Sequence, residues 1–221
     1  MPCCLKLTGL LALLLLNSCA INPPEISSIS KRLIIAANSD KGDFTEQLSL
    51  MVSVRDKDGF SDIEHLYVLN DPDEIFWALD AENWIKQEEG DAVWIGHNSL
   101  RGPEPLLPRG DYRLVLVDRA GERDERALII REPVTDIYDG PRPRLEKLSM
   151  LLDSPYTANT AFFFDAAGNV RRTVDIKPGT TLLDELWPDA GWRTGADYLA
   201  VYAFNTKSET GYFSWKIRLP D

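Results

Sequence analysis

Cysteine is scarce in this sequence of 221 residues, and its three cysteines, Cys3, Cys4 and Cys19, all lie within the first nineteen positions. If the chain is cleaved before Cys19, no pair of thiols remains, so the fold must rest on core burial without a disulfide. Histidine is scarcer still, and His65 and His97 do not suggest a zinc site without cysteine partners. The HExxH, GxSxG and P-loop patterns are absent from the sequence, which therefore does not indicate an enzyme.

Basic residues are in deficit, with 24 lysines and arginines against 35 aspartates and glutamates and a formal net charge of −11. This balance argues against a nucleic-acid partner, because phosphate binding needs a basic face. It also argues against contact with an anionic membrane through a polybasic patch. Apolar residues make up 44% of the chain, which suits a globular fold rather than disorder.

Long apolar runs are missing as well: the run over residues 10–16 falls short of the roughly 20 residues that a membrane-spanning helix needs. It follows Lys6 and precedes small residues, which is the layout of a secretory signal peptide over residues 1–18. The segment Leu16-Asn17-Ser18-Cys19 resembles the lipobox of bacterial lipoproteins, in a relaxed form similar to that of spirochaetes. An ordinary signal peptide with an incidental cysteine is the alternative.

The resemblance implies that Cys19 becomes the first residue of the mature chain and carries the acyl chains, palmitate among them. The protein would then be extracytoplasmic and anchored to a membrane through its lipid. Because Ala20 rather than aspartate follows Cys19, the resemblance favours the outer membrane if the cell has two membranes. Residues 19–30 are predicted to form a lipidated tether, since prolines and serines hold this segment extended.

From Lys31 onward the sequence has the pattern of β-strands. Apolar side chains recur with period two over Leu48–Val54, and about seven short strands with turn signals between them predict a β-sandwich over residues 31–132. Tyr112 stands at the start of a late strand and resembles the corner tyrosine of Ig-like and fibronectin-type sandwiches, whose hydroxyl bonds upstream backbone. The same corner explains the tripeptide Arg109-Gly-Asp, which also resembles an integrin-binding sequence.

Residues 133–146 hold three prolines and a glycine and are predicted to be a linker to a smaller β-sandwich-like domain over residues 147–221. The segments Gly110–Val117 and Gly195–Tyr202 each lead through a polar hairpin to a final strand, which suggests two related domains. One domain with a C-terminal β extension is the alternative. Helix is expected only near Thr181–Trp187, with the threonine as N-cap. The sequence therefore predicts an all-β fold, an Ig-like β-sandwich followed by a second, smaller β domain.

One turn, DKDGFSD over residues 56–62, gathers carboxylates. Asp56, Asp58 and Asp62 are candidate calcium ligands, because calcium prefers several hard oxygens that converge on one loop. The glutamate of a complete EF-hand loop is missing, and a tight turn between strands, where Asp and Gly are favoured, is the alternative. No other metal or cofactor is expected.

Three tryptophans, Trp77, Trp84 and Trp94, lie close together in the sequence with acidic residues between them. Aromatic faces beside acidic side chains can bind sugars or cationic ligands, so the three are candidate ligand-binding residues. The alternative is that they fill the core of the sandwich.

These observations favour a lipid-anchored, extracytoplasmic binding or scaffolding protein of the bacterial cell envelope that is not an enzyme. β-Sandwiches often bind partners through end loops or by lending an edge strand, so an envelope protein is the expected partner. A carbohydrate-binding module that uses the tryptophans is the alternative. A glycan hydrolase is a more distant third, because abundant carboxylates alone do not place a catalytic pair.

Overall fold

The structure is a computed structural model, and it describes residues 22–220. The predicted signal peptide and Cys19 lie outside the described residues. The fold is all-β, as the sequence predicts, with sixteen strands in three sheets and only short helical segments in the described part of the chain. Within residues 22–220, none of the helices has the length and apolar character needed to cross a membrane.

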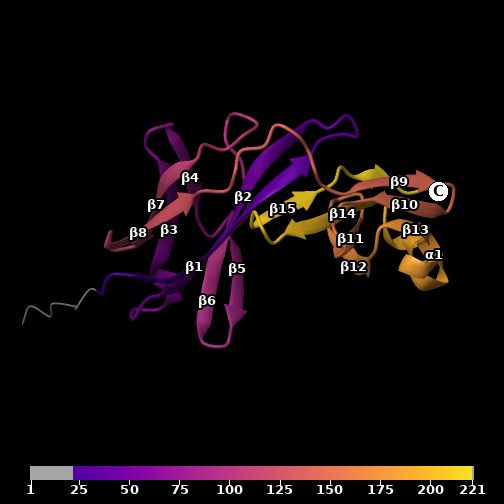
Figure 1. The fold of residues 1–221 in the computed structure, drawn as a ribbon. Coiled ribbons are helices and arrows are strands. Elements are labelled where there is room, and N and C mark those ends of the chain that lie inside the picture. Colours follow the sequence, from indigo (N-terminus) through magenta and orange to yellow (C-terminus); the bar gives the residue numbers. More distant parts are fainter. Residues whose placement is uncertain (1–21, 221) are drawn as a thin grey trace, which may run out of the picture.

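A nine-stranded sheet, here called the long sheet, runs through the whole molecule (Figure 1). Its main path has the order β12 (Val170–Ile176), β11 (Asn159–Phe164), β14 (Tyr198–Asn205), β15 (Thr210–Phe213), β1 (Glu25–Ala37), β2 (Phe44–Arg55), β6 (Ala92–Leu100) and β5 (Ile85–Glu89). The ninth strand, β16 (Ile217–Arg218), pairs with β14.

Two smaller sheets cover the long sheet, one in each half of the molecule. The four-stranded sheet has the order β4 (Ile75–Leu79), β3 (Ile63–Asn70), β7 (Gly110–Asp118) and β8 (Arg123–Ile130). The three-stranded sheet has the order β13 (Gly179–Leu182), β10 (Ser149–Asp153) and β9 (Arg142–Glu146). The short helical segments are η1 (Phe60–Asp62), α1 (Leu183–Leu186), η2 (Pro188–Ala190) and α2 (Trp192–Gly195).

The first core lies between the four-stranded sheet and strands β1, β2 and β6. Leu48, Leu50, Val52 and Val54 of β2 all point into it and are at most 3% exposed, which confirms the predicted alternation. Tyr112, at the start of β7, is buried in the same core, and its hydroxyl donates to the backbone oxygen of Pro108 over 3.0 Å. This is the hydrogen bond that the corner motif predicts.

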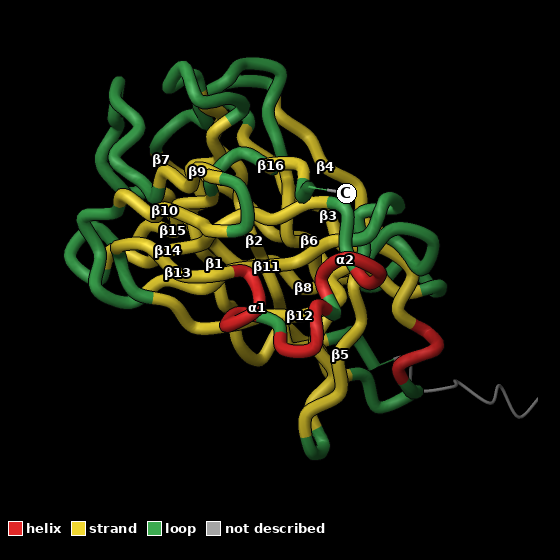
Figure 2. The backbone as a smooth tube through the Cα atoms, turned by 90° about the vertical axis from the view of Figure 1, so that its right-hand side faces the viewer, coloured by secondary structure: helices red, strands yellow, loops and turns green. Residues whose placement is uncertain are grey.

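The second core lies between the three-stranded sheet and strands β11 and β14, and α1 and α2 close its end (Figure 2). Met150, Phe163, Leu199 and Trp192 are among its buried members. The predicted threonine N-cap is wrong, because Leu182 occupies the N-cap of α1 without a capping side chain. Thr181 belongs to strand β13 instead, where it pairs with Met150.

The structure corrects the predicted tether at its C-terminal end. Strand β1 begins at Glu25 and pairs with β2 from there, so residues 25–30 belong to the long sheet. Ile26, opposite Val54, reaches the first core and is 3% exposed. The burial of this side chain favours a strand, although the serines of the segment suggest a tether. The predicted linker is likewise shorter at its end, because residues 142–146 form β9 at the edge of a sheet, where proline is tolerated.

The two halves are not separated by the linker, because β15 of the second half pairs in parallel with β1 of the first. Figure 1 shows yellow β15 beside indigo β1. A third buried cluster fills this junction and includes Ile35, Tyr138 and Tyr212. One sheet and one small core therefore join the regions that the sequence suggests as two domains.

Candidate functional site

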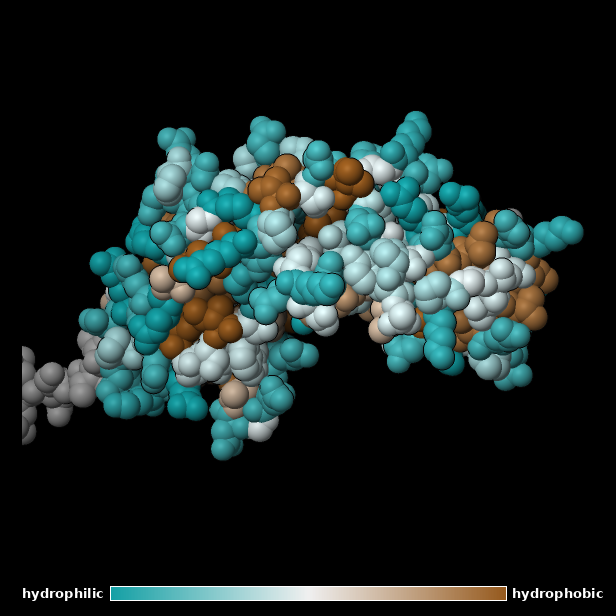
Figure 3. Space-filling model, in the orientation of Figure 1, coloured by the Kyte–Doolittle hydropathy of each residue, from teal (hydrophilic) through white to brown (hydrophobic). Residues whose placement is uncertain are grey.

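The outward face of the long sheet, opposite both cores, forms a groove across the junction of the halves. On β1, Leu33 and Ile35 are buried, while Arg32, Ile34 and Ala36 point to the other side. Because one sheet passes through both halves, the outward side chains of β2, β6, β11, β14 and β15 continue this surface. The groove has a volume of about 1060 Å³, and the molecule is visibly hollowed between the β5–β6 hairpin and the second half (Figure 3).

An aromatic cluster forms one wall of the groove. Phe213 of β15 lies at its centre, with ring centroids 5.3 Å from Phe162, 6.5 Å from Phe164 and 5.9 Å from Tyr202. The strand register causes this, because Tyr202 is directly opposite Phe213 in the β14–β15 pair. Phe162, Tyr202 and Phe213 remain partly exposed, so the rings are available for contact.

Basic side chains border the aromatic cluster. The Arg32 guanidinium lies 4.6 Å from the centroid of the Phe204 ring and donates to the Tyr202 hydroxyl over 3.2 Å. The Lys216 ammonium lies 4.3 Å from the centroid of the Phe164 ring. Such contacts hold a cation over an aromatic face without neutralising its charge.

The charge of the groove differs from that of the rest of the chain. Its lining includes Lys31, Arg32, Arg101 and Lys216, and no aspartate or glutamate is among the lining residues that the structure describes. Lys31 is neutralised, because it forms an ion pair with Glu132. Among residues 22–220, no carboxylate forms an ion pair with the other three cations; Arg101 donates instead to the Gln47 side chain over 3.2 Å.

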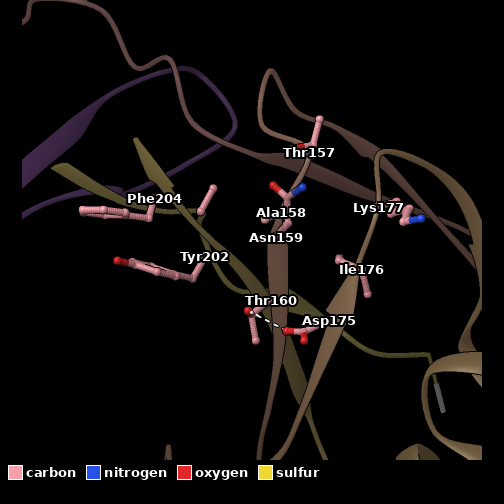
Figure 4. Close-up of a pocket in the computed structure, with 10 residues that line it drawn as sticks. Thr157, Ala158, Asn159, Thr160, Asp175, Ile176, Lys177, Tyr202 and Phe204 are labelled. Carbon is pink, nitrogen blue, oxygen red and sulfur yellow. Dashed lines mark hydrogen bonds between the residues drawn. The ribbon is translucent and has the colours of Figure 1, made fainter. Parts of the chain in front are cut away.

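A smaller pocket of about 410 Å³ continues past Tyr202 toward the edge of the long sheet. Figure 4 shows Tyr202 and Phe204 of β14 on one side and Asp175 and Lys177 on the other. Thr160 of β11 lies between them and donates to the Asp175 carboxylate over 3.2 Å. The smaller pocket therefore carries both positive and negative side chains. In the large groove, the charged lining residues are all basic.

The structure does not bring the three candidate tryptophans together. Trp77 and Trp84 pack against the first core, and Trp77 stacks on Tyr112 with centroids 6.2 Å apart. The Trp77 indole N–H donates to the backbone oxygen of Arg101 over 2.8 Å. Trp94 lies on the outward side of β6, where it lines a separate pocket with Gln87 and other residues. The three indoles form no common platform.

The structure brings two of the three candidate calcium ligands together and adds a different third one. Carboxylate oxygens of Asp56, Asp62 and Asp118 all lie within 4.8 Å of one another. Asp58 is exposed instead, and its side chain accepts the backbone N–H of Asn22 over 3.1 Å. Asp118 begins a D-x-x-G turn at the end of a strand. This turn could have indicated that a second connection supplies a further carboxylate to the site.

Burial raises the pKa of Asp56 above its ordinary value of 3.8. A hydrogen bond from the Asp58 backbone N–H lowers the pKa, but the negative charges of Asp58, Asp62 and Asp118 raise it further. The Asp56 carboxylate thus sits among like charges, which favours either a proton or a bound cation.

The groove residues were missed by sequence reasoning for a different reason. The run Ala161-Phe-Phe-Phe164 alternates between a buried and an outward side, but periodicity does not say which face will meet another sheet. The pairing of β15 with β1 brings Phe162 and Phe213 into one groove with Arg32, and no local sequence pattern predicts that pairing.

No protein-family model and no curated protein matches this sequence. Among solved structures, the chain is similar to Tp47, the 47-kilodalton lipoprotein of Treponema pallidum, with 9% sequence identity and a TM-score of 0.40 over 89% of this chain. It spans 50% of the length of that structure. A biofilm-associated protein BSP domain is similar with 12% identity and a TM-score of 0.25, over 87% of this chain and 30% of that one. Both TM-scores are too low to carry an inference about function.

Proposed function

We propose that this protein is a lipid-anchored, non-catalytic binding protein of the bacterial cell envelope, whose groove holds an acidic, extended segment of a partner protein. The observation that carries the proposal is a surface on which three cations form no ion pair with any carboxylate of residues 22–220 and lie beside partly exposed aromatic rings, in a chain of net charge −11. Electrostatic complementarity of this kind selects partners and accelerates their encounter.

Arg32, Arg101 and Lys216 supply the charge that an acidic segment needs. Arginine binds carboxylates through two parallel N–H donors, and such charge-assisted hydrogen bonds are among the stronger ones in proteins. Arg32 is already oriented by its contacts with Phe204 and Tyr202, so less side-chain entropy is lost when it binds.

The aromatic cluster supplies apolar contact area between these cations. Aromatic residues and arginine are the types most enriched at the energetically important positions of protein interfaces. Phe213 contacts the rings of Phe162 and Tyr202 in tilted arrangements, so the three rings form one continuous apolar surface. A segment that carries acidic and aromatic or aliphatic side chains fits both parts of the groove.

The anchor in this proposal is Cys19, on the basis of the lipobox-like segment Leu16–Cys19. Because β1 begins at Glu25, six residue-to-residue steps separate its first residue from Cys19, and they can span at most about 20 Å. The first half would therefore stay close to the membrane surface. Exchange of Cys19 for serine should release the protein from the membrane fraction; continued acylation of that variant would contradict the assignment.

The groove is tested with a defined probe, a fluorescein-labelled peptide of alternating glutamate and tyrosine, and with a lysine–tyrosine peptide of equal length. Fluorescence anisotropy should show binding of the acidic peptide to the wild-type protein and none of the basic one. The variant Arg32→Glu/Arg101→Glu/Lys216→Glu should bind the acidic peptide at least about tenfold more weakly, because three attractions become repulsions.

The matched control changes the same number of charges outside the groove, as Lys41→Glu/Arg131→Glu/Arg144→Glu. All three residues are exposed, and none of them lines the large groove. The control should bind the acidic peptide like the wild type. Equal weakening in both variants would show that net charge alone is responsible, and competition by a single-stranded oligonucleotide with higher affinity would favour a nucleic acid over a protein segment.

A further inference from the structure

Three carboxylates from two connections meet at one end of the first sandwich. Asp56 follows β2, Asp62 ends the short η1 turn before β3, and Asp118 ends β7. Their oxygens lie within 4.8 Å of one another. This aspartate cluster is separate from the groove, and neither Asp62 nor Asp118 lines any of the cavities described above.

Backbone hydrogen bonds fix the two connections against each other. Asp118 is opposite Ile63 in the β3–β7 pair, which places it beside Asp62. The Arg119 N–H donates to the Asp62 backbone oxygen over 2.9 Å. Within the first connection, the Asp58 N–H donates to the Asp56 side chain over 2.8 Å, and Gly59 adopts a φ of 109°, which favours glycine. The cluster is therefore built by rigid elements rather than by chance proximity of mobile side chains.

Asp118 provides the observation that points to a ligand. Its side chain is 0% exposed, and one carboxylate oxygen accepts the Glu122 N–H over 2.8 Å. Its other oxygen, Oδ2, is buried and has no hydrogen-bond partner within the described residues. Asp56 Oδ2 is buried without a partner in the same way. A buried carboxylate oxygen without a partner is unfavourable unless a proton or a cation satisfies it.

No cationic side chain satisfies these oxygens. Among residues 22–220, neither lysine nor arginine forms an ion pair with Asp56, Asp62 or Asp118. Three carboxylates so close together repel one another, which is unfavourable unless a cation offsets their charge. A divalent cation would offset most of the charge and occupy both orphaned oxygens.

We propose that Asp56, Asp62 and Asp118 form a calcium-binding site. Calcium binds oxygen ligands at about 2.4 Å, so two ligands of one ion lie at most about 4.8 Å apart, and the oxygens of the three carboxylates lie within that limit. Three side chains leave positions for water, as in weak extracytoplasmic calcium sites with dissociation constants of about 10⁻⁴–10⁻³ M. Magnesium fits less well, because it demands near-ideal octahedral geometry at about 2.1 Å.

Calcium at this position would join the β2–β3 connection to the β7–β8 hairpin and so close one end of the first sandwich. Asp58 lies outside the site but binds the backbone of Asn22, at the start of the described chain. The site therefore lies beside the point where the chain enters the fold. The proposal does not depend on the groove or on its partner.

The test compares thermal unfolding of the full-length protein, purified in detergent, in chelator and in roughly 10 mM calcium or magnesium. Calcium should raise the wild-type Tm by about 3–10 °C, and magnesium by much less. Asp118→Asn should remove the calcium-dependent rise while melting in chelator no lower than the wild type, because one repulsive charge is gone. Asp58→Asn, the matched control, should keep the full rise.

Isothermal titration of calcium into the same proteins provides the direct measurement, with a dissociation constant raised at least about tenfold by Asp118→Asn. If that variant does not fold, Asp62→Asn takes its place. A wild-type Tm that calcium does not change, an equal rise with magnesium, or a rise that survives Asp118→Asn would each overturn the proposal. If Asp58→Asn also loses the rise, the ligands would be those predicted from the turn alone, Asp56, Asp58 and Asp62. That result would also overturn the proposal.

Discussion

Ile35 of β1 lies opposite Tyr212 of β15, and the two side chains are buried together at the middle of the long sheet. Ile35 comes from the first strand that the structure describes, and Tyr212 comes from the C-terminal part of the chain. Their contact makes one body of the two halves, and it places the outward residues of both on the same face. The candidate groove exists because of this pairing.

The first prediction concerns this junction. Tyr212 is 7% exposed and contacts the rings of Tyr138 and Tyr156 at 6.1 Å and 5.6 Å. Tyr212→Ala should lower the free energy of unfolding by about 3 kcal/mol, as for other buried aromatic truncations. Urea unfolding, followed by tryptophan fluorescence and circular dichroism, measures the change. Val170→Ala, at an exposed position, should leave the midpoint unchanged, and two separate wild-type transitions would contradict a single cooperative body.

The second prediction concerns an ion pair between the sheets of the first half. Glu46 of β2 is 1% exposed, and both its oxygens accept Arg109 donors over 2.7 Å. Glu46→Ala should destabilise the protein by about 3–5 kcal/mol, because it leaves the arginine partly buried without its partner. Glu88→Ala removes an exposed partner of Lys86 and should change the urea midpoint little.

The same pair bears on the tripeptide Arg109-Gly-Asp111. Because the Arg109 side chain is 18% exposed and held by Glu46, it is not displayed for a receptor in the way that an integrin-binding loop requires. We therefore expect that an Asp111→Ala variant and the wild type adhere equally to integrin-coated surfaces.

The third prediction is a pH dependence that arises from Glu132 and Lys31. Burial tends to raise the pKa of Glu132, but hydrogen bonds from Lys31 and from backbone N–H groups outweigh it, so its pKa lies below the ordinary 4.5. A lowered carboxyl pKa stabilises the folded state fully above pH 4.5, and this stability is lost as the pH falls through the folded-state pKa. Lys31→Met should therefore destabilise the protein at neutral pH more than in acid. An equal loss at both pH values, measured by urea unfolding, would count against this ion pair.

The fourth prediction concerns the corner tyrosine. Burial raises the pKa of Tyr112 to about 12, so the folded protein binds a proton there that the unfolded chain releases near 10. This contribution to stability is complete below pH 10 and is lost as the pH rises toward 12. Tyr112→Phe should cost about 1–2 kcal/mol at neutral pH through loss of the hydrogen bond to Pro108. A variant as stable as the wild type would show that this hydrogen bond does not hold the corner.

Sequence reasoning succeeded where structure is local. Leu48–Val54 alternates because a strand places successive side chains on opposite faces, and the apolar face is the one that the core buries. Tyr112 was identifiable because its partner is four residues away. The same reasoning failed at residues 25–30, where serines that suit a tether also suit the outward face of a strand.

The candidate sites show the same division. Asp56 and Asp62 lie in one turn and were found together, whereas Asp118 joins them through the β3–β7 pairing. Trp77 and Trp84 were proposed as ligand-binding residues because they are close in sequence, but both pack against the first core, Trp77 from strand β4 and Trp84 from the connection before β5. Proximity along the chain does not decide the direction in which a side chain points.

Composition and short spacing were enough to identify the all-β class, the corner at Tyr112, the deficit of positive charge and the lipobox-like segment that ends at Cys19. The pairing of β15 with β1, the place of Asp118 in the aspartate cluster and the common groove of Arg32, Tyr202 and Phe213 follow only from the tertiary structure. The physical reason is that strand pairing depends on which distant strands bury their apolar faces together, and each pairing then fixes the neighbours of every outward side chain.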